Sequence, residues 1–251
     1  MKVLGIDVGG SGVKGAIVDV KDGTLQTERH RIPTPKPATP EAVAATVRKV
    51  ARHFKWKGPI GCTLPARIQK GVAKTAANIH ESWINTPVKS LLQEATQCPV
   101  AVLNDADAAG VASMEFGAGR GRKDLVIMLT VGTGIGSAMF HRGRLIPGSE
   151  LGHLPLHGDS AEVYAADSAR KRDALSWADW AARFQEYLDL VEFLLAPDLI
   201  ILGGGVSRPG KVKEFRHLLN TRAEFVPAVL ENEAGMIGAA VIARKKARKR
   251  K

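Results

Sequence analysis

An aspartate followed by a glycine-rich segment is the first feature of this sequence that could do chemistry. Asp7 ends an apolar run, and a turn-like segment follows it that contains Gly9, Gly10, Ser11 and Gly12. Because glycine lacks a Cβ, such a turn lets backbone N–H groups approach an anion closely, while a nearby carboxylate can hold a hydrated cation. The pattern is equally typical of an ordinary β-hairpin with a glycine turn. The segment alone therefore leaves both interpretations open.

A second carboxylate stands where another strand meets a helix. The apolar run 99–103 predicts a short strand, and Asn104 and Asp105 follow it at the start of an alanine-rich helix that extends to about residue 116. Polar groups at this position can simply cap the helix N-terminus. They also lie at the carboxyl end of a strand, where α/β proteins place their reactive groups. This pair is therefore a candidate both for capping and for catalysis.

Two further glycine turns follow apolar runs later in the chain. Residues 125–130 and 137–140 predict a pair of strands, and the turn between them contains Gly132, Thr133 and Gly134. This segment resembles residues 3–19, which predicts two similar halves, each with a phosphate-binding turn. A third turn ends the run 198–202 and consists of Gly203, Gly204 and Gly205. Three such turns indicate several phosphates or one long phosphate chain.

Other phosphate-binding signatures do not fit this sequence. It contains no Gly-x-x-x-x-Gly-Lys-[Ser/Thr] loop of the Walker type. The spacing Gly10-x-Gly12-x-x-Gly15 lies within the predicted hairpin rather than at the start of a helix. A Rossmann dinucleotide site is therefore disfavoured.

The segments between these turns predict alternating strands and helices. We expect strands over 24–32 and 58–64, and helices over 42–54, 87–95, 160–172, 176–195, 211–220 and 232–243. Thr39-Pro40 predicts the start of the first of these helices, and Ser176 with Asp179 predicts a capping box. The alternation is that of an α/β protein.

Composition narrows the classes of function. With 251 residues, of which 45% are hydrophobic and 24% charged, the chain has the composition of an ordinary globular protein. We find no apolar run long enough to cross a membrane and expect no signal peptide. A cytoplasmic location is therefore expected. Cys62 and Cys98 predict buried thiols rather than a disulfide or zinc site. The net charge of +11 predicts attraction to a polyanion, whether nucleic acid, an anionic membrane or polyphosphate.

Five motifs, in order, resemble those of the ROK sugar kinases of the actin-like ATPase superfamily. They are the segments 7–15, 103–107, 130–137, 150–153 and 202–207, and together they cover nearly the whole chain. Within that family the resemblance is strongest to the glucokinases and glucomannokinases that use polyphosphate. It implies an actin-like ATPase (ribonuclease H-like) α/β fold with two α/β domains around a central cleft. The expected domains are 1–108, with helix 236–251 packed back on it, and 109–235.

The resemblance also implies a role for each candidate residue. Asp105 would be the general base, and Asp7 would position Mg²⁺ through water. Sugar hydroxyls would be bound by Asn78, Asn104, Asp105, Glu150, His153 and Glu162. Glu162 is equally consistent with a solvent-facing position on a helix. Phosphates would be bound by Gly9, Gly10, Ser11, Gly12, Lys14, Gly132, Thr133, Gly134, Gly203, Gly204 and Gly205. Because no cysteine occurs in 154–162, no zinc loop is expected and His153 is assigned to the sugar.

The implied reaction is phosphorylation of the 6-hydroxyl of glucose, and of mannose if the site accepts it. The donor would be inorganic polyphosphate, with ATP as an open alternative, and the enzyme would be a homodimer. A positive track for polyphosphate would contain Arg120, Arg122, Lys123, Arg142, Arg144, Arg170, Lys171 and Arg172. An ATP-only hexokinase is the first alternative. A nucleic-acid-binding regulator is disfavoured, because the first hairpin starts at residue 3 and only 5% of residues are aromatic. We expect neither nucleic acid nor membrane as a partner, and a solvated basic tail over 244–251.

Overall fold

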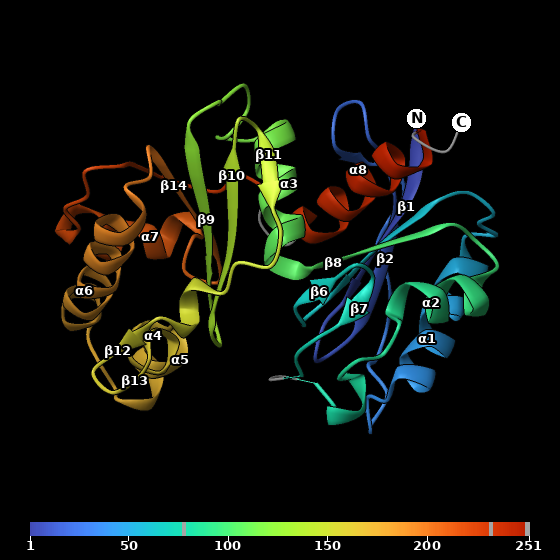
Figure 1. The fold of residues 1–251 in the computed structure, drawn as a ribbon, viewed down its shortest axis with the longest axis horizontal. Coiled ribbons are helices and arrows are strands. Elements are labelled where there is room, and N and C mark those ends of the chain that lie inside the picture. The colour runs from blue at the N-terminus through green and yellow to red at the C-terminus, as the bar shows by residue number, and fades with distance from the viewer. Residues whose placement is uncertain (77–78, 231–232, 249–251) are drawn as a thin grey trace. The chain divides into compact units, whose positions relative to one another are not determined.

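The computed structural model describes residues 1–76, 79–230 and 233–248, and the chain divides into two compact units. Unit 1 comprises Met1–Ala112 together with the segment from Glu233 onward, and unit 2 comprises Ser113–Asn232 (Figure 1). The domain boundaries expected from the sequence followed residues 108 and 235, whereas the units change over after residues 112 and 232. Each unit contains its own sheet and its own hydrophobic core.

The sheet of unit 1 has the strand order β3-β2-β1-β5-β8, with β4 also paired to β2. Its strands are β1 (Lys2–Val8), β2 (Val13–Asp19), β3 (Thr24–Leu25), β4 (His30–Ile32), β5 (Ile60–Leu64) and β8 (Val100–Asn104). β1 and β2 form the predicted antiparallel hairpin, whereas β5 and β8 run parallel to β1. A small separate hairpin consists of β6 (Ile68–Gln69) and β7 (Val72–Ala73). The parallel strands bring the carboxyl ends of β1, β5 and β8 to one edge of the sheet.

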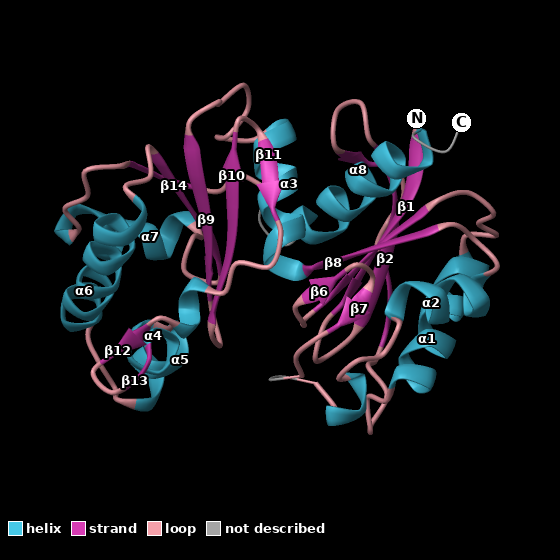
Figure 2. Cartoon of the chain, viewed as in Figure 1, coloured by secondary structure: helices cyan, strands magenta, loops and turns pink. Residues whose placement is uncertain are grey.

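Helices cover both faces of this sheet (Figure 2). They are α1 (Pro40–His53), α2 (Val88–Thr96) and α8 (Ala234–Arg248). Unit 1 also contains the 3₁₀ turn Glu81–Trp83, and α3 (Asp105–Phe116) begins in unit 1 and ends in unit 2. As predicted, Thr39 caps α1, and its hydroxyl accepts a hydrogen bond from Ala42 N. α1 and α2 contact each other and pack with the sheet in one core, while α8 packs against β1, β5 and β8. Cys62 and Cys98 are both buried free thiols, as expected.

Glycines in the sheet allow α8 to lie unusually close to it. A Cβ at Gly61 would overlap the backbone of Ala239, and a Cβ at Gly5 would lie 2.5 Å from the carbonyl oxygen of Met236. A side chain at either position would push the helix away from the strands. α8 therefore starts beside the carboxyl end of β1, where a Cβ at Gly235 would lie 3.5 Å from Asp7 Oδ1.

Unit 2 repeats the strand arrangement of unit 1, which confirms the predicted similarity of the two halves. The order is β11-β10-β9-β14-β15, with an antiparallel hairpin β9–β10 and with β14 and β15 parallel to β9. The strands are β9 (Leu125–Val131), β10 (Ile135–His141), β11 (Arg144–Ile146), β14 (Leu199–Gly204) and β15 (Glu224–Pro227). A small hairpin contains β12 (Pro155–Leu156) and β13 (Asp159–Ser160). β11 was not expected from the sequence.

The helices of unit 2 are α4 (Ala161–Ala165), α5 (Asp167–Arg172), α6 (Trp177–Leu195) and α7 (Pro209–Phe215), with 3₁₀ turns over Leu151–His153 and Arg216–Leu218. The predicted capping box is confirmed, because Asp179 N donates to Ser176 Oγ at 3.1 Å. Three expectations need correction. Residues 244–248 of the expected solvated tail belong to α8, and Arg244 Nη1 donates to Val20 O at 3.0 Å. The predicted helix 160–172 is broken at Ala166, which is extended with ψ 163°, and the predicted strand 24–32 is two short strands.

Candidate active site

Asp7 is held between two side chains at the carboxyl end of β1. The parallel register places Thr63 beside it, and Thr63 Oγ1 donates a hydrogen bond to Asp7 Oδ1 at 2.7 Å. Across the hairpin, Lys14 Nζ lies 4.0 Å from the other oxygen, Asp7 Oδ2. The Asp7 side chain is 23% exposed, so it can still be reached from solvent. A fixed, accessible carboxylate is the kind of oxygen ligand that fits a hydrated Mg²⁺.

Asn104 and Asp105 have different roles at the start of α3. Asn104 Oδ1 accepts from the N–H groups of Ala106 at 2.8 Å and of Asp107 at 3.2 Å, so Asn104 provides the main cap of the helix. Its amide also donates to Ala66 O at 3.3 Å, which fixes the orientation of the side chain. Asp105 Oδ1 shares the N–H of Ala106 at 2.9 Å, yet the residue remains exposed. Capping therefore explains Asn104 better than it explains Asp105.

The surroundings of Asp105 make it a stronger base than an ordinary aspartate. Burial raises the pKa of the Asp105 carboxyl, and the negative charge of Asp7 raises it further, while the hydrogen bond from Ala106 N acts in the opposite direction. Burial has this effect although the residue is exposed, because protein atoms surround the carboxylate and exclude part of its water. A carboxylate with a raised pKa and open access suits proton transfer.

The first glycine turn has its carbonyl groups held from outside the turn. Gly9 N donates to Gly12 O at 3.1 Å and closes it. Thr34 Oγ1 donates to Gly9 O at 2.5 Å, and Arg31 Nη2 donates to Ser11 O at 2.6 Å. Within the described part of the chain, the N–H groups of Gly10, Ser11 and Gly12 have no hydrogen-bond acceptor. Carbonyls turned toward the protein and free N–H groups are what an anion-binding turn requires.

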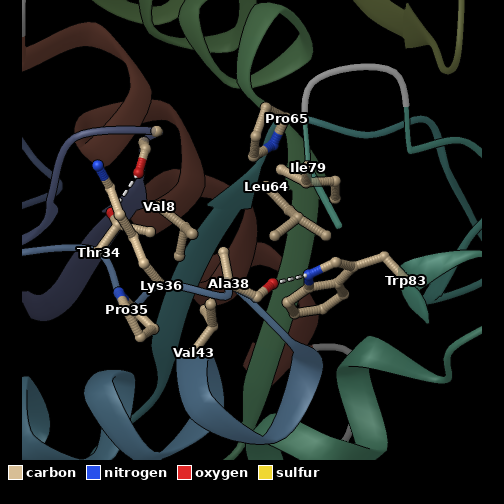
Figure 3. A pocket seen from close by; sticks show the side chains of 12 residues that line it. Val8, Thr34, Pro35, Lys36, Ala38, Val43, Leu64, Pro65, Ile79 and Trp83 are labelled. Carbon is tan, nitrogen blue, oxygen red and sulfur yellow. Dashed lines mark hydrogen bonds between the residues drawn. The ribbon is translucent and has the colours of Figure 1, made fainter. Parts of the chain in front are cut away.

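A small apolar pocket lies beside this turn (Figure 3). It has a volume of about 120 Å³, and Gly9, Gly10, Thr34, Leu64 and Trp83 are among the residues that line it. Trp83 is almost fully buried, and its indole N–H donates to Ala38 O at 2.8 Å. This bond locks the loop that carries Thr34. Trp83 in the pocket wall thus helps to hold the loop that carries Thr34, whose hydroxyl binds Gly9 O of the first glycine turn.

The second glycine turn, between β9 and β10, is built in the same way. Gly132 N donates to Gly134 O at 2.9 Å. Ser168, at the start of α5, binds two carbonyls of the turn, since its N–H donates to Gly132 O at 3.1 Å and its hydroxyl donates to Thr133 O at 2.5 Å. Among the described residues, nothing accepts from the N–H groups of Thr133 and Gly134. Both hairpin turns thus present free N–H groups.

Glu162 connects this second turn to the candidate sugar ligands of unit 2. Its Oε2 accepts from Ile135 N at 2.9 Å, and its Oε1 lies 3.9 Å from His153 Nδ1. The side chain is only 25% exposed, so the solvent-facing interpretation of Glu162 is wrong. His153 is 51% exposed and ends a 3₁₀ turn in which its N–H donates to Glu150 O at 3.0 Å. Glu162, His153 and Glu150 are therefore brought together, with the second turn beside them.

The third glycine segment lies partly inside a strand. Gly203 and Gly204 belong to β14 and are paired with Thr130 and Val131 of β9. Gly204 has φ +81°, and a Cβ there would overlap the backbone of Val131, so strand geometry by itself accounts for this glycine. A Cβ at Gly205 would lie 4.0 Å from Val131 O, an ordinary contact, so packing does not require this glycine. Asn78, the remaining candidate, lies outside the described residues.

Sequence reasoning missed the side chains that hold the site together. Thr63 is the one polar side chain of an otherwise apolar strand end, and this was a usable signal for the partner of Asp7. Thr34 lies in a proline-rich loop and Ser168 in a helical segment, and neither gave such a signal. Their contacts join residues 25 and 35 positions apart in the chain.

Half of the expected positive track, four of its eight residues, is paired with carboxylates inside unit 2. Arg122 forms ion pairs with Asp124 at 2.9 Å and Glu224 at 2.7 Å. The buried Asp167 binds two further members, Arg170 at 3.0 Å and Lys171 at 2.8 Å. Arg172 pairs with Asp173 at 2.7 Å. These four side chains stabilise the fold, and their charges are already compensated.

In the part of the chain that the structure describes, no group of three or more His, Cys, Asp or Glu side chains could hold a metal ion. The described helices likewise include none that is both long and apolar enough to span a membrane.

Comparison with known proteins places this geometry in context. Polyphosphate glucokinase of Mycobacterium tuberculosis is 47% identical over 239 residues, which cover 95% of this chain and 89% of that protein. The crystal structure of inorganic polyphosphate/ATP-glucomannokinase from Arthrobacter sp. strain KM is also 47% identical, with a TM-score of 0.91 and coverage of 98% and 99%. ROK hexokinase from Thermus thermophilus is 26% identical, with a TM-score of 0.74 and coverage of 99% and 100%.

These similarities confirm the predicted fold and decide the family. The structural match extends over nearly all of both chains, which confirms the actin-like ATPase fold expected from the motifs. The ROK family model matches residues 3–171, which contain both hairpin turns, Asp7, Asn104, Asp105 and the Glu150, His153 and Glu162 group. The chain therefore belongs to the ROK family.

Proposed function

We propose that this chain is a polyphosphate glucokinase, which transfers a phosphoryl group from inorganic polyphosphate to the 6-hydroxyl of glucose. The observation that carries this proposal is Asp105, an accessible carboxylate with a raised pKa at the same sheet edge as Asp7 and the first glycine turn. The name of the Mycobacterium tuberculosis relative supports the choice of sugar and donor.

In this mechanism Asp105 accepts the proton of the sugar hydroxyl as that oxygen attacks the terminal phosphorus. A raised pKa strengthens the carboxylate as a proton acceptor, and access leaves room for the sugar. Asp7 would hold Mg²⁺ through water, with Thr63 fixing its orientation. When bound, Mg²⁺ would neutralise phosphate charge. Lys14, 4.0 Å from Asp7, would contribute a second positive charge beside the donor.

The donor would be bound by backbone N–H groups rather than by side chains alone. Gly10, Ser11 and Gly12 in the first turn and Thr133 and Gly134 in the second have N–H groups with no acceptor among the described residues. Such preorganised groups can bind phosphate oxygens without a rearrangement of the turn. Gly205 would extend this set, and Gly9, Gly132, Gly203 and Gly204 would let the backbone approach the phosphates.

The sugar would be recognised by amide, carboxylate and imidazole groups. Asn104 holds a fixed orientation through its bond to Ala66 O, so its remaining polar atoms can discriminate between hydroxyl positions. In unit 2, Glu150 and His153 would bind further hydroxyls, with Glu162 positioning His153. Asn78 is proposed as a sugar ligand from the resemblance alone. We also propose that mannose is accepted, as the name of the Arthrobacter relative suggests.

The direct test is a donor comparison. We expect glucose 6-phosphate to form with polyphosphate in the absence of nucleotide, and to form with ATP as well, because the Arthrobacter relative is named for both donors. Initial rates with each donor at saturating glucose and Mg²⁺ distinguish the possibilities. Turnover with ATP and none with polyphosphate would favour the alternative function, an ATP-only hexokinase like the Thermus relative in name.

Three further proposals concern the state of the enzyme. We propose that it works as a homodimer in the cytoplasm, that the two units act as domains around a central cleft, and that Mg²⁺ is required for turnover. A charge of +11 is consistent with a polyanionic donor.

A further inference from the structure

A second pocket lies at the end of the unit 1 sheet opposite to Asp7 and Asp105. It has a volume of about 240 Å³ and is open to solvent along β8, the edge strand of the sheet. Pro59 and Pro99, which precede β5 and β8, form its floor with Val100, and Ala243 of α8 forms one wall. The walls carry Lys89 from the first turn of α2 and Lys246 from the last turn of α8. We call this the Lys89–Lys246 pocket.

The charge of this pocket is uncompensated. None of the described residues that line it is acidic. Within the described part of the chain neither ammonium group forms an ion pair or hydrogen bond, in contrast to Arg122, Arg170, Lys171 and Arg172. Burial lowers the pKa of Lys246, and the positive charge of Lys89 lowers it further. Two ammonium groups that repel each other in a hollow would be stabilised by an anion between them.

The edge of β8 adds a neutral donor to the same pocket. Ile60 N donates to Pro99 O at 2.8 Å, and Ile60 is in register with Val100. In a parallel ladder this leaves the peptide groups of Val100 directed away from β5, toward the open edge. An anion in the pocket would therefore meet two ammonium groups and a backbone N–H. The room is about that of several water molecules, which suits a short stretch of a phosphate chain.

We propose that the Lys89–Lys246 pocket binds a distal segment of the polyphosphate donor and anchors long chains to the enzyme. This inference rests on the proposed function. The five residues of β8 separate the pocket from Asp105, a span of roughly 17 Å. Tripolyphosphate, with only three phosphates, is too short for that span, so the anchor distinguishes long polyphosphate from tripolyphosphate. Of the described residues, Arg248 also lies with Lys246 in the last turn of α8.

The test is a pair of double variants with equal loss of charge. The first is Lys89→Gln with Lys246→Gln, and the control is Lys49→Gln with Lys213→Gln, which removes two exposed lysines from α1 and α7. Two measurements are made. One is the KM for polyphosphate of about 100 phosphates and for tripolyphosphate, at saturating glucose. The other is calorimetric binding of the long polyphosphate without glucose, at several salt concentrations.

For the pocket variant we expect the long-chain KM and Kd to rise about tenfold, while the tripolyphosphate KM and kcat stay unchanged. The slope of log Kd against log salt should fall by about one to two, because two cations no longer displace counterions. The control should behave as the wild type. An equal rise of the long-chain Kd in both double variants, or no change of that Kd in the pocket variant, would contradict the proposal that the pocket anchors polyphosphate. If the wild type used ATP alone, the proposed function would fail, yet the binding measurement would still decide whether the pocket holds polyphosphate.

Discussion

At the scale of single residues, the site depends on two carboxylates with unlike surroundings. Asp7 is held by Thr63 and faces Lys14. Asp105 forms no ion pair with any described residue, and its pKa is raised by burial and by Asp7. Opposite environments for two nearby carboxylates favour opposite roles, one for charge and metal binding and one for proton transfer. The cost is stability, because burial penalises the charged form of Asp105.

This cost leads to a prediction about Asp105→Asn. A raised native pKa means that the Asp105 contribution to stability is present below the unfolded pKa of about 3.9 and is lost as pH rises through the native value. Asparagine cannot ionise, so the variant should match the wild type near pH 4 and have the higher Tm near pH 7. Thermal unfolding across that range measures it. Glu94→Gln, which removes an exposed carboxylate of α2, is the control and should show no such divergence. A lower Tm of Asp105→Asn at neutral pH would contradict the prediction.

A second residue-scale prediction concerns the hydroxyl that holds the first turn. Thr34→Val keeps the shape of the side chain but removes the donor to Gly9 O. Losing one such bond costs about 1 kcal/mol, so the KM for the phosphoryl donor should rise about fivefold. The KM for glucose should change little. Thr86→Val removes a similar hydroxyl that donates to Ser82 O at 2.8 Å, and it should leave both constants unchanged. Equal effects of the two variants would argue against a role for Thr34 in the turn.

At the scale of elements, both sheets deliver a glycine turn from an antiparallel hairpin and then add parallel strands beside it. In unit 1 the position of α8 matters most, because this helix starts next to Asp7 and packs across the strands that carry the site. Glycines in β1 and β5 make that close packing possible. Helix placement is therefore set by residues that have no side chain.

The resulting prediction compares a glycine-to-alanine substitution at Gly61, in β5, with the same substitution at Gly210, in α7. In Gly61→Ala the new methyl would meet the backbone of Ala239, which cannot rotate away, so we expect a loss of about 2 kcal/mol and a Tm lower by about 4–8 °C. Gly210→Ala in α7 meets nothing within 4 Å and should stabilise the protein by about 0.5 kcal/mol. Thermal unfolding of both variants gives the comparison. A stable Gly61→Ala protein would mean that α8 can shift without penalty.

Some parts of the fold and of the candidate site could be predicted from the sequence, and others could not. The β1–β2 hairpin, the Thr39 cap and the Ser176–Asp179 capping box were predicted correctly, because each depends on residues close together in the sequence. The break at Ala166 was missed because the flanking residues all favour a helix. The choice between Asn104 and Asp105 as the cap depended on side-chain orientation, which composition does not encode. The contacts of Thr34 and Ser168 with the turns depend on the fold itself.

At the scale of the whole molecule, the cations behind the net charge of +11 differ in whether a carboxylate is paired with them. The arginines around Asp167 and Asp173 stabilise unit 2 through ion pairs, so they contribute little free charge for a ligand. Lys89 and Lys246 in unit 1 keep theirs. Net charge alone thus predicted a polyanionic partner but not the residues that would meet it. The paired and unpaired cations could be told apart only in the folded chain.

The central claim is that Asp105 is the base of a polyphosphate-dependent glucokinase. It is tested most directly by measuring glucose 6-phosphate formed from glucose and polyphosphate, without nucleotide, by the wild type and by Asp105→Asn. We predict turnover by the wild type, a kcat at least about 100-fold lower for the variant, and glucose binding that is largely kept, because the amide preserves the shape of the carboxylate. No product from the wild type, or a variant with near-normal kcat, would contradict this account.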